Sequence, residues 1–161
     1  MAENDKRPMV GVLSLIMKGD RVLLIKRSQN VHGPGTWAPP GGHIEYGETP
    51  DQATIRETKE EVDLTINNPK FRTMTNDVFE AEQKHYITIW METNDFSGEP
   101  KLQAPREETD IGWFTWDSLP EPLFLSLQNL LAGKTYPPQT GGVWHQPGVI
   151  PPVEDFPPVG Q

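Results

Sequence analysis

The feature that most constrains this chain is a helix signal that begins at Thr49. Thr49 is a good helix-capping residue, Pro50 occupies the first helical position, and the amide of Gln52 follows three residues after the cap. This arrangement is a capping box with a proline at the start of the helix. We expect the helix to run to about Val62.

This helix carries three carboxylates on one face. Glu57, Glu60 and Glu61 are spaced i, i+3 and i+4, so their side chains project from a single turn. Like charges at these spacings each destabilise a helix by about 0.2–0.5 kcal/mol, and Arg56 cannot balance all three. Mg²⁺ and Mn²⁺ prefer such oxygen ligands. The pattern indicates either a divalent-metal site or a solvated acidic face.

The residues before the helix favour the metal site. Gly41 and Gly42 allow the backbone to approach a ligand closely, and Glu45, Gly47 and Glu48 follow before the helix cap. An isolated acidic face has no need of this glycine-rich approach. The pattern therefore predicts a metal-nucleotide site at the carboxylate face of the helix.

The same residues resemble the Nudix box, the strand-loop-helix motif of hydrolases that act on nucleoside diphosphates linked to another moiety. The matching positions are Gly42, Glu48, Arg56, Glu57, Glu60 and Glu61. The chain departs from the family pattern at Pro39, commonly leucine, at Thr58, usually a bulky aliphatic, and at Asp63, usually glycine. Thr58 is expected to loosen helix packing, and Asp63 puts the backbone at the helix end in question.

The resemblance implies an α+β fold, the Nudix α/β/α sandwich with a mixed β-sheet. It also implies Mg²⁺ or Mn²⁺, with Glu57 and Glu61 as principal ligands, Glu60 sharing metal or base duty, and the carbonyl of Gly41 as a further ligand. Arg56 matches the arginine that orients the cluster, and Glu48 the glutamate that braces the loop. Many relatives add an acidic residue before the last strand, for which Glu108 and Glu107 are the candidates, with surface charge as the alternative.

From about Pro8 to Lys134 the chain is most similar to the MutT-like nucleoside triphosphate diphosphatases, including the Nudix-type motif fifteen branch. That similarity implies conversion of (deoxy)nucleoside triphosphates, including oxidised purines such as 8-oxo-dGTP, to monophosphate and pyrophosphate. The alternatives are another nucleoside diphosphate derivative (NADH, ADP-ribose, dihydroneopterin triphosphate) or a nucleotide-binding module without catalysis. The similarity also implies a homodimer.

Four further residues are candidates for substrate binding. Leu123 and Phe124 match positions that wall the base pocket in this branch, Arg27 could reach a phosphate, and His43 lies in the box loop. The ordinary alternatives are core packing for Phe124 and a strand-end charge for Arg27. Tyr86 and the tryptophans Trp90, Trp113 and Trp116 are expected to be structural.

The remaining pattern predicts one domain with a sheet. Alternating or β-branched runs indicate strands at Met9–Met17, Arg21–Arg27, Phe71–Phe79, His85–Met91 and Gly112–Thr115, the first four forming two hairpins. A second helix is expected over Leu123–Leu131. The resulting division is an N-terminal arm at 1–8, the Nudix domain at 9–135 and a Pro/Gly-rich tail at 136–161.

Composition excludes several classes of function. The chain has no cysteine, which removes disulfides and thiolate chemistry, and its net charge of -9 disfavours a nucleic acid polymer as partner. No apolar run is long enough to cross a membrane, and the start lacks the pattern of a secretory signal. A cytoplasmic location is the expectation.

Overall fold

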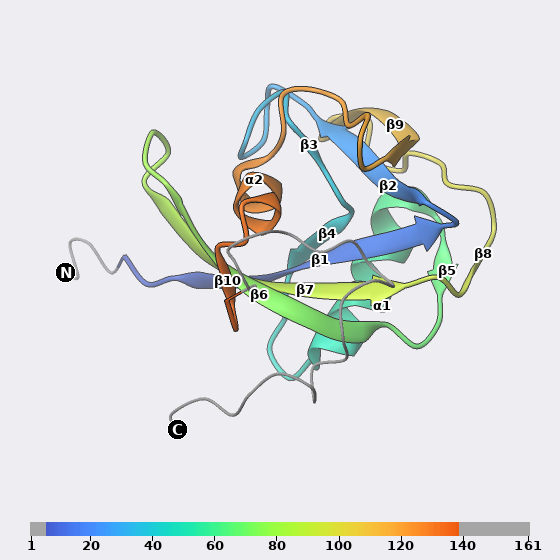
Figure 1. The fold of residues 1–161 in the computed structure, drawn as a ribbon, viewed down its shortest axis with the longest axis horizontal. Helices are drawn as coiled ribbons and strands as arrows, with labels where there is room; N and C mark the ends of the chain where they lie inside the picture. The colour runs from blue at the N-terminus through green and yellow to red at the C-terminus, as the bar shows by residue number, and fades with distance from the viewer. Residues whose placement is uncertain (1–5, 139–161) are drawn as a thin grey trace.

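The computed structural model describes residues 6–138, and its centre is an eight-stranded sheet with the strand order β10-β6-β7-β1-β2-β3, to which β4 adds on β1 and β9 on β2 (Figure 1). These strands are β1 (Met9–Lys18), β2 (Arg21–Arg27), β3 (Trp37–Ala38), β4 (Gly41–His43), β6 (Lys70–Phe79), β7 (Lys84–Thr93), β9 (Glu108–Thr115) and β10 (Thr135–Tyr136). A small separate sheet joins β5 (Thr65–Ile66) to β8 (Phe96–Ser97). The two expected hairpins, β1–β2 and β6–β7, are confirmed.

Strand β1 organises the sheet because it pairs on both edges. It runs parallel to β7 from Met9 to Ile16 and antiparallel to β4 and β2 on its other edge. Alternate side chains of β1 enter different cores: Leu15 packs in a cluster with residues of the C-terminal helix, and Ile16 in a cluster with Val62. Both faces of β1 are therefore covered, which explains why its sequence is apolar almost throughout.

Helix α1 (Pro50–Val62) begins as the sequence predicts. The Thr49 hydroxyl accepts the Gln52 amide at 3.2 Å, and the Gln52 side chain accepts the Thr49 amide at 3.0 Å. The helix ends at Asp63, which adopts the left-handed conformation at φ 57°, a backbone conformation that glycine usually takes at helix ends. Lys59 stabilises this end, since its ammonium lies 2.8 Å from the Asp63 carboxylate. The departure at Asp63 thus leaves the helix end intact.

Helix α2 (Leu125–Leu131) is shorter than expected. Phe124 is its cap residue, and Leu123 forms an isolated parallel bridge with Trp37, so neither lies in the helix. The Trp37 amide donates a hydrogen bond to the carbonyl of Pro122, and the Phe124 amide donates one to the carbonyl of Trp37. This pairing with β3 holds the chain extended up to Phe124, a contact between distant segments that periodicity does not reveal.

Other boundaries also depend on tertiary pairing. Strand β9 begins at Glu108 rather than Gly112, because β2 offers a partner along its whole length. The short strands β3, β4, β5, β8 and β10 were not predicted, since each is only two or three residues long. Tyr136, placed at the start of the expected tail, pairs with Met74 of β6. Of that division, the parts at 1–5 and 139–161 lie outside the described residues.

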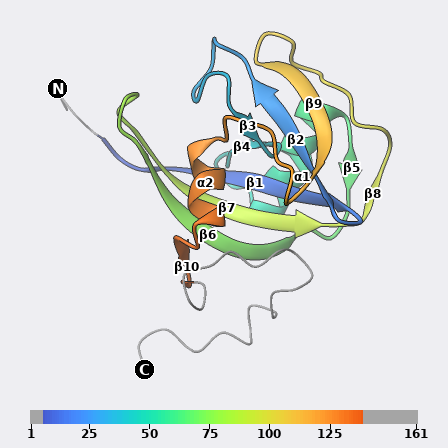
Figure 2. The same ribbon diagram turned by 45° about the horizontal axis from the view of Figure 1, so that its top comes forward.

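The helices α1 and α2 cover opposite faces of the central sheet (Figures 1 and 2). Leu127 and Leu130 of α2 pack in the first core cluster, and Val62 of α1 in the second. The α/β/α sandwich with a mixed sheet is therefore confirmed. Within residues 6–138 no helix has the length and apolarity to span a bilayer.

Candidate active site

A cavity of about 390 Å³ opens beside the segment of β1 that pairs with β4. Its walls come from β1, β2, β4, α1, β7, the start of β9 and the cap of α2. Its lining includes the carboxylates of Glu57, Glu61 and Glu108, whose charges interact with one another. It also includes the ring of His32, which contacts the rings of Tyr86 and Phe124. We call these two groups the acidic end and the aromatic end of the cavity.

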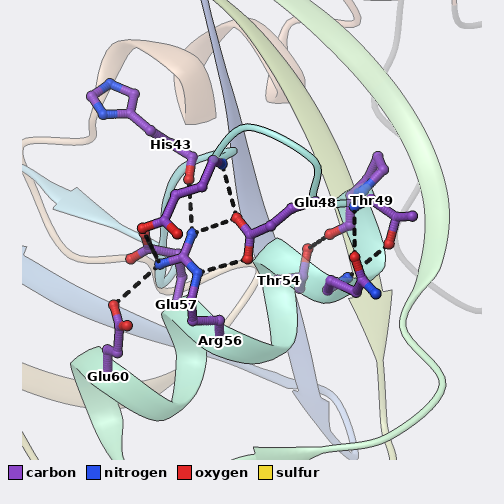
Figure 3. A network of polar contacts seen from close by, with 10 residues as sticks. His43, Glu48, Thr49, Thr54, Arg56, Glu57 and Glu60 are labelled. Atoms are coloured by element: carbon purple, nitrogen blue, oxygen red, sulfur yellow. Dashed lines mark hydrogen bonds and ion pairs between the residues drawn. The ribbon is translucent and has the colours of Figure 1, made fainter.

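Arg56 organises the acidic end (Figure 3). Its guanidinium donates to both oxygens of Glu48, at 2.7 and 2.8 Å, to Glu57 at 2.9 Å, to Glu60 at 3.2 Å and to the carbonyl of His43 at 3.0 Å. The bond from Arg56 lowers the pKa of the Glu48 carboxyl to about 2, and the carboxylates raise the pKa of Arg56. One cation thereby ties the box loop to the helix.

Glycines bring the backbone of β4 against two of the carboxylates. A Cβ on Gly42 would lie 2.6 Å from each carboxylate oxygen of Glu57, so only glycine leaves room for that side chain. The Gly41 amide donates to Glu61 at 3.0 Å. Burial raises the pKa of Glu57, and it raises the pKa of Glu61 well above its ordinary value.

Glu108, the first residue of β9, is the third carboxylate of the acidic end. Its side chain is only 3% exposed, and neither carboxylate oxygen has a hydrogen-bond donor within residues 6–138. Burial, and then the charge of Glu107, raises the pKa of Glu108 to about 7. Glu108 and Glu57 each also raise the pKa of Glu61. Glu108 is therefore the stronger candidate of the pair, because Glu107 is exposed.

The acidic end suits a divalent cation. Buried carboxylate oxygens without partners are costly unless a cation or proton neutralises them. In the described part of the chain no three His, Asp or Glu side chains already form a ligand set for one ion. Mg²⁺ typically needs only one or two carboxylates beside water and phosphate oxygens. Glu57, Glu61 and Glu108 are the residues that would hold it.

The aromatic end is built from three segments far apart in sequence. The guanidinium of Arg27 lies 4.8 Å from the ring centroid of Phe124, a cation–π contact. Tyr86 stacks between His43, at 5.5 Å, and His32, at 5.0 Å. Burial lowers the pKa of Arg27 and of His32. The cavity can thus place a flat apolar group beside a cation.

Most of the residues expected from the sequence meet in this cavity. Its lining includes Arg27, Gly41, Gly42, His43, Glu57, Glu61, Glu108 and Phe124. Three expected residues lie outside the lining: Arg56, which bonds to the box loop and Glu57, and also Glu60 and Leu123. Glu60 is 59% exposed and held by Arg56, and Leu123 packs against the core beside Trp37 rather than lining the cavity. Leu123 forms a backbone bridge with Trp37 and packs against the first core cluster, so it does not form the wall predicted for it.

Sequence reasoning missed His32, Lys84 and Tyr86 as wall residues. Tyr86 and Thr88 face the cavity from alternate positions of β7, and this period of two was visible in the sequence. His32 carried no comparable signal, because its loop has no regular pattern. Only the tertiary fold brings that loop to the cavity.

Comparison with known proteins identifies related sequences and folds. A family model described as NUDIX domain matches residues 5–133. The ADP-ribose pyrophosphatase of Methanocaldococcus jannaschii is 34% identical over 73% of this chain and 68% of its own length. The 8-oxo-dGTP diphosphatase of Escherichia coli is 30% identical over 78% of this chain and 99% of its own length.

Two further similarities extend this picture. The crystal structure of a MutT NUDIX hydrolase from Burkholderia pseudomallei matches with a TM-score of 0.70 and 31% identity, over 73% of this chain and 91% of the other. The NAD-capped RNA hydrolase NudC of Pseudomonas aeruginosa is 31% identical over 68% of this chain, which spans only 37% of that relative.

Proposed function

The chain belongs to the NUDIX family, and from that membership and the acidic end of its cavity we propose that it hydrolyses (deoxy)nucleoside triphosphates, including oxidised purine forms such as 8-oxo-dGTP, to the monophosphate and pyrophosphate. The observation that carries this proposal is the meeting of Glu57, Glu61 and Glu108 in a cavity whose other end is aromatic. A triphosphate needs cationic neutralisation at its phosphates and a flat apolar surface at its base. The carboxylates would bind the cation, and the aromatic rings would contact the base.

The metal in this proposal is Mg²⁺ or Mn²⁺. When bound, it neutralises phosphate charge and lowers the pKa of a water molecule. Glu57 and Glu61 would hold it, Glu108 would add a third carboxylate, and the Gly41 carbonyl is a further candidate ligand. Glu60 shares metal or base duty, for which it must exchange its contact with Arg56.

The other residues bind and orient the substrate. Arg56 fixes Glu57 and the box loop, so it keeps the acidic end assembled. Arg27 supplies positive charge between the two ends, while Phe124 and His43 flank the base. A homodimer, expected from the resemblance, stays a prediction that sedimentation or light scattering can test.

ADP-ribose is the second candidate substrate. The observation that favours it is the Methanocaldococcus jannaschii relative, whose identity of 34% is similar to that of the Escherichia coli relative at 30%. Both substrates contain a phosphoric anhydride, so the acidic end serves either. The aromatic end must then discriminate between them.

A substrate panel with purified protein tests the proposal. dGTP, 8-oxo-dGTP, ADP-ribose and NADH are incubated with Mg²⁺ or Mn²⁺, and nucleoside monophosphate and pyrophosphate are quantified. We expect the triphosphates to release both products only when metal is present. Faster cleavage of ADP-ribose would favour the second candidate, and nucleotide binding without turnover would identify a non-catalytic module.

Matched variants test the site assignment. Glu57→Gln and Glu61→Gln should each lower kcat by more than about 100-fold, beyond the 10- to 100-fold typical of residues that only orient a ligand. Glu99→Gln, an exposed residue away from the cavity, is the control. Undiminished turnover in both cavity variants would contradict the assignment.

A further inference from the structure

The aromatic end of the cavity is closed by two segments that are distant in sequence. The loop 28–36, between β2 and β3, contributes Val31 and His32, and the β6–β7 hairpin contributes Lys84 and Tyr86. This hairpin projects well beyond the rest of the sheet (Figure 1). A wall built from a loop and a projecting hairpin needs a contact that fixes the position of one relative to the other.

Glu82, in the turn of the hairpin, supplies that contact. One carboxylate oxygen bonds to Nδ1 of His32, and the other accepts the amide of Gly33 at 3.0 Å. The bonded residues lie about fifty positions away in the chain, and the His32 side chain is 10% exposed. We call this contact of Glu82 with His32 and Gly33 the loop latch.

The loop latch reaches the substrate-binding residues through the loop itself. The carbonyl of His32 accepts a bond from Nε of Arg27 at 2.5 Å, and Arg27 lies over Phe124. Gly33 passes so close to Phe124 that a Cβ there would lie 2.5 Å from the ring. The ring of His32 packs against Phe79, Tyr86 and Phe124 at centroid distances of 4.0, 5.0 and 5.5 Å. Displacing His32 would therefore disturb Arg27 and Phe124 together.

We propose that Glu82 is a positioning residue for the nucleotide: it holds loop 28–36 against the hairpin and so fixes Arg27 and Phe124 where the substrate binds. This inference rests on the proposed function for its ligand, but the loop latch itself is independent of the reaction. Glu82 does not line the cavity, and it lies on a different segment from the carboxylates of α1 and β9. Its loss should weaken binding and leave the chemical step nearly unchanged.

The kinetic test compares Glu82→Ala with Glu80→Ala, an exposed glutamate in the same turn. Losing a charge-assisted bond typically weakens an interaction by about tenfold. Glu82→Ala should therefore raise KM about fivefold to tenfold with kcat within about twofold. Glu80→Ala should leave both unchanged, and Glu82→Gln, which keeps one acceptor oxygen, should recover part of the loss. A KM equal to that of Glu80→Ala, or a fall in kcat alone, would overturn the inference.

A second measurement does not depend on turnover. Amide hydrogen exchange at Gly33 should accelerate in Glu82→Ala and not in Glu80→Ala, because only the former removes its acceptor. Unchanged protection at Gly33 would refute the loop latch. If the wild-type protein hydrolyses no nucleotide, the proposed function fails, while the exchange rates still decide whether Glu82 holds the loop.

A double-mutant cycle identifies the partner. His32→Phe keeps a ring of similar shape but removes Nδ1, so Glu82→Ala should raise KM by a smaller factor in that background than in the wild type, because only the bond to Gly33 is left to lose. Fully additive effects of the two substitutions would show that the bond to His32 does not position the loop, against the inference.

Discussion

The guanidinium of Arg56 donates two hydrogen bonds to the carboxylate of Glu48, from Nε to Oε2 at 2.7 Å and from Nη2 to Oε1 at 2.8 Å. Glu48 lies in the loop before α1 and Arg56 lies in the second turn of that helix, so the pair joins the two halves of the box. The same guanidinium also holds Glu57 and the carbonyl of His43. The loop and the helix therefore reach the cavity as one unit.

Replacing Arg56 by lysine should show that geometry, rather than charge, matters at this pair. Lysine keeps a positive charge but cannot bond Glu48, Glu57 and His43 at once. We expect kcat/KM to fall by about 10- to 100-fold, the usual range for residues that orient metal ligands. Lys59→Gln, an exposed position on the same helix, is the control and should retain activity. Wild-type kinetics in Arg56→Lys would show that charge alone suffices.

The two glycines of β4 should respond differently to alanine. The atoms nearest to a Cβ on Gly42 would be those of the Glu57 carboxylate, the far end of a side chain, whereas a Cβ on Gly41 would lie 2.0 Å from the carbonyl oxygen of Val12. Gly42→Ala should therefore fold with a Tm near that of the wild type but lose metal affinity and activity. Gly41→Ala should lose stability. Thermal unfolding and Mg²⁺ titration distinguish them, and equal losses of Tm in both would contradict this assignment.

Two buried threonines of α1 make a matched pair for stability. Thr54 and Thr58 are both fully buried, but the Thr54 hydroxyl donates to the carbonyl of Pro50 at 2.7 Å. The Thr58 hydroxyl has no hydrogen-bond partner within residues 6–138. Replacing it by valine removes an unsatisfied polar group and should stabilise the protein by about 1 kcal/mol, while Thr54→Val should destabilise it by a similar amount. Urea unfolding measures both, and a loss of stability in Thr58→Val would be inconsistent with an unpartnered hydroxyl.

Stability in the absence of metal should depend on pH through Glu108. Burial raises its pKa from about 4.5 to about 7, so the folded state favours the protonated carboxyl. This contribution is fully present below about pH 4.5 and is lost as the pH rises through about 7. Its size is of the order of 3 kcal/mol, at about 1.4 kcal/mol per pKa unit.

Unfolding free energies measured in EDTA from pH 4.5 to 8 check this dependence. Glu108→Gln should flatten the decline, and Glu99→Gln should not, since Glu99 is exposed. Glu57 and Glu61 titrate in the same direction, so part of the decline should remain. Saturating Mg²⁺ should restore stability at pH 8, because the cation neutralises the same carboxylates. A decline that is identical in Glu108→Gln would exclude this residue as its source.

Local chemistry in the sequence determined α1 and its carboxylate face. The capping box of Thr49 and Gln52 is a contact between near neighbours, and the spacing of Glu57 and Glu61 fixes their common side once the helix forms. The hairpins and the β1 and β2 strands were predictable for the same reason, since alternation and turn residues act within a few positions.

Only the tertiary structure decided how the cavity is closed. β9 begins at Glu108, before the predicted start at Gly112, because these earlier residues pair with β2. Glu108 is buried at this position, near the carboxylates of α1. Leu123 lies outside the cavity wall predicted for it, and the residues on either side of it, Pro122 and Phe124, form backbone hydrogen bonds with Trp37 of β3. His32 and Glu82 meet across about fifty residues. These contacts form between segments whose separation in sequence carries no periodic signal, so they exist only once the sheet has placed the segments side by side.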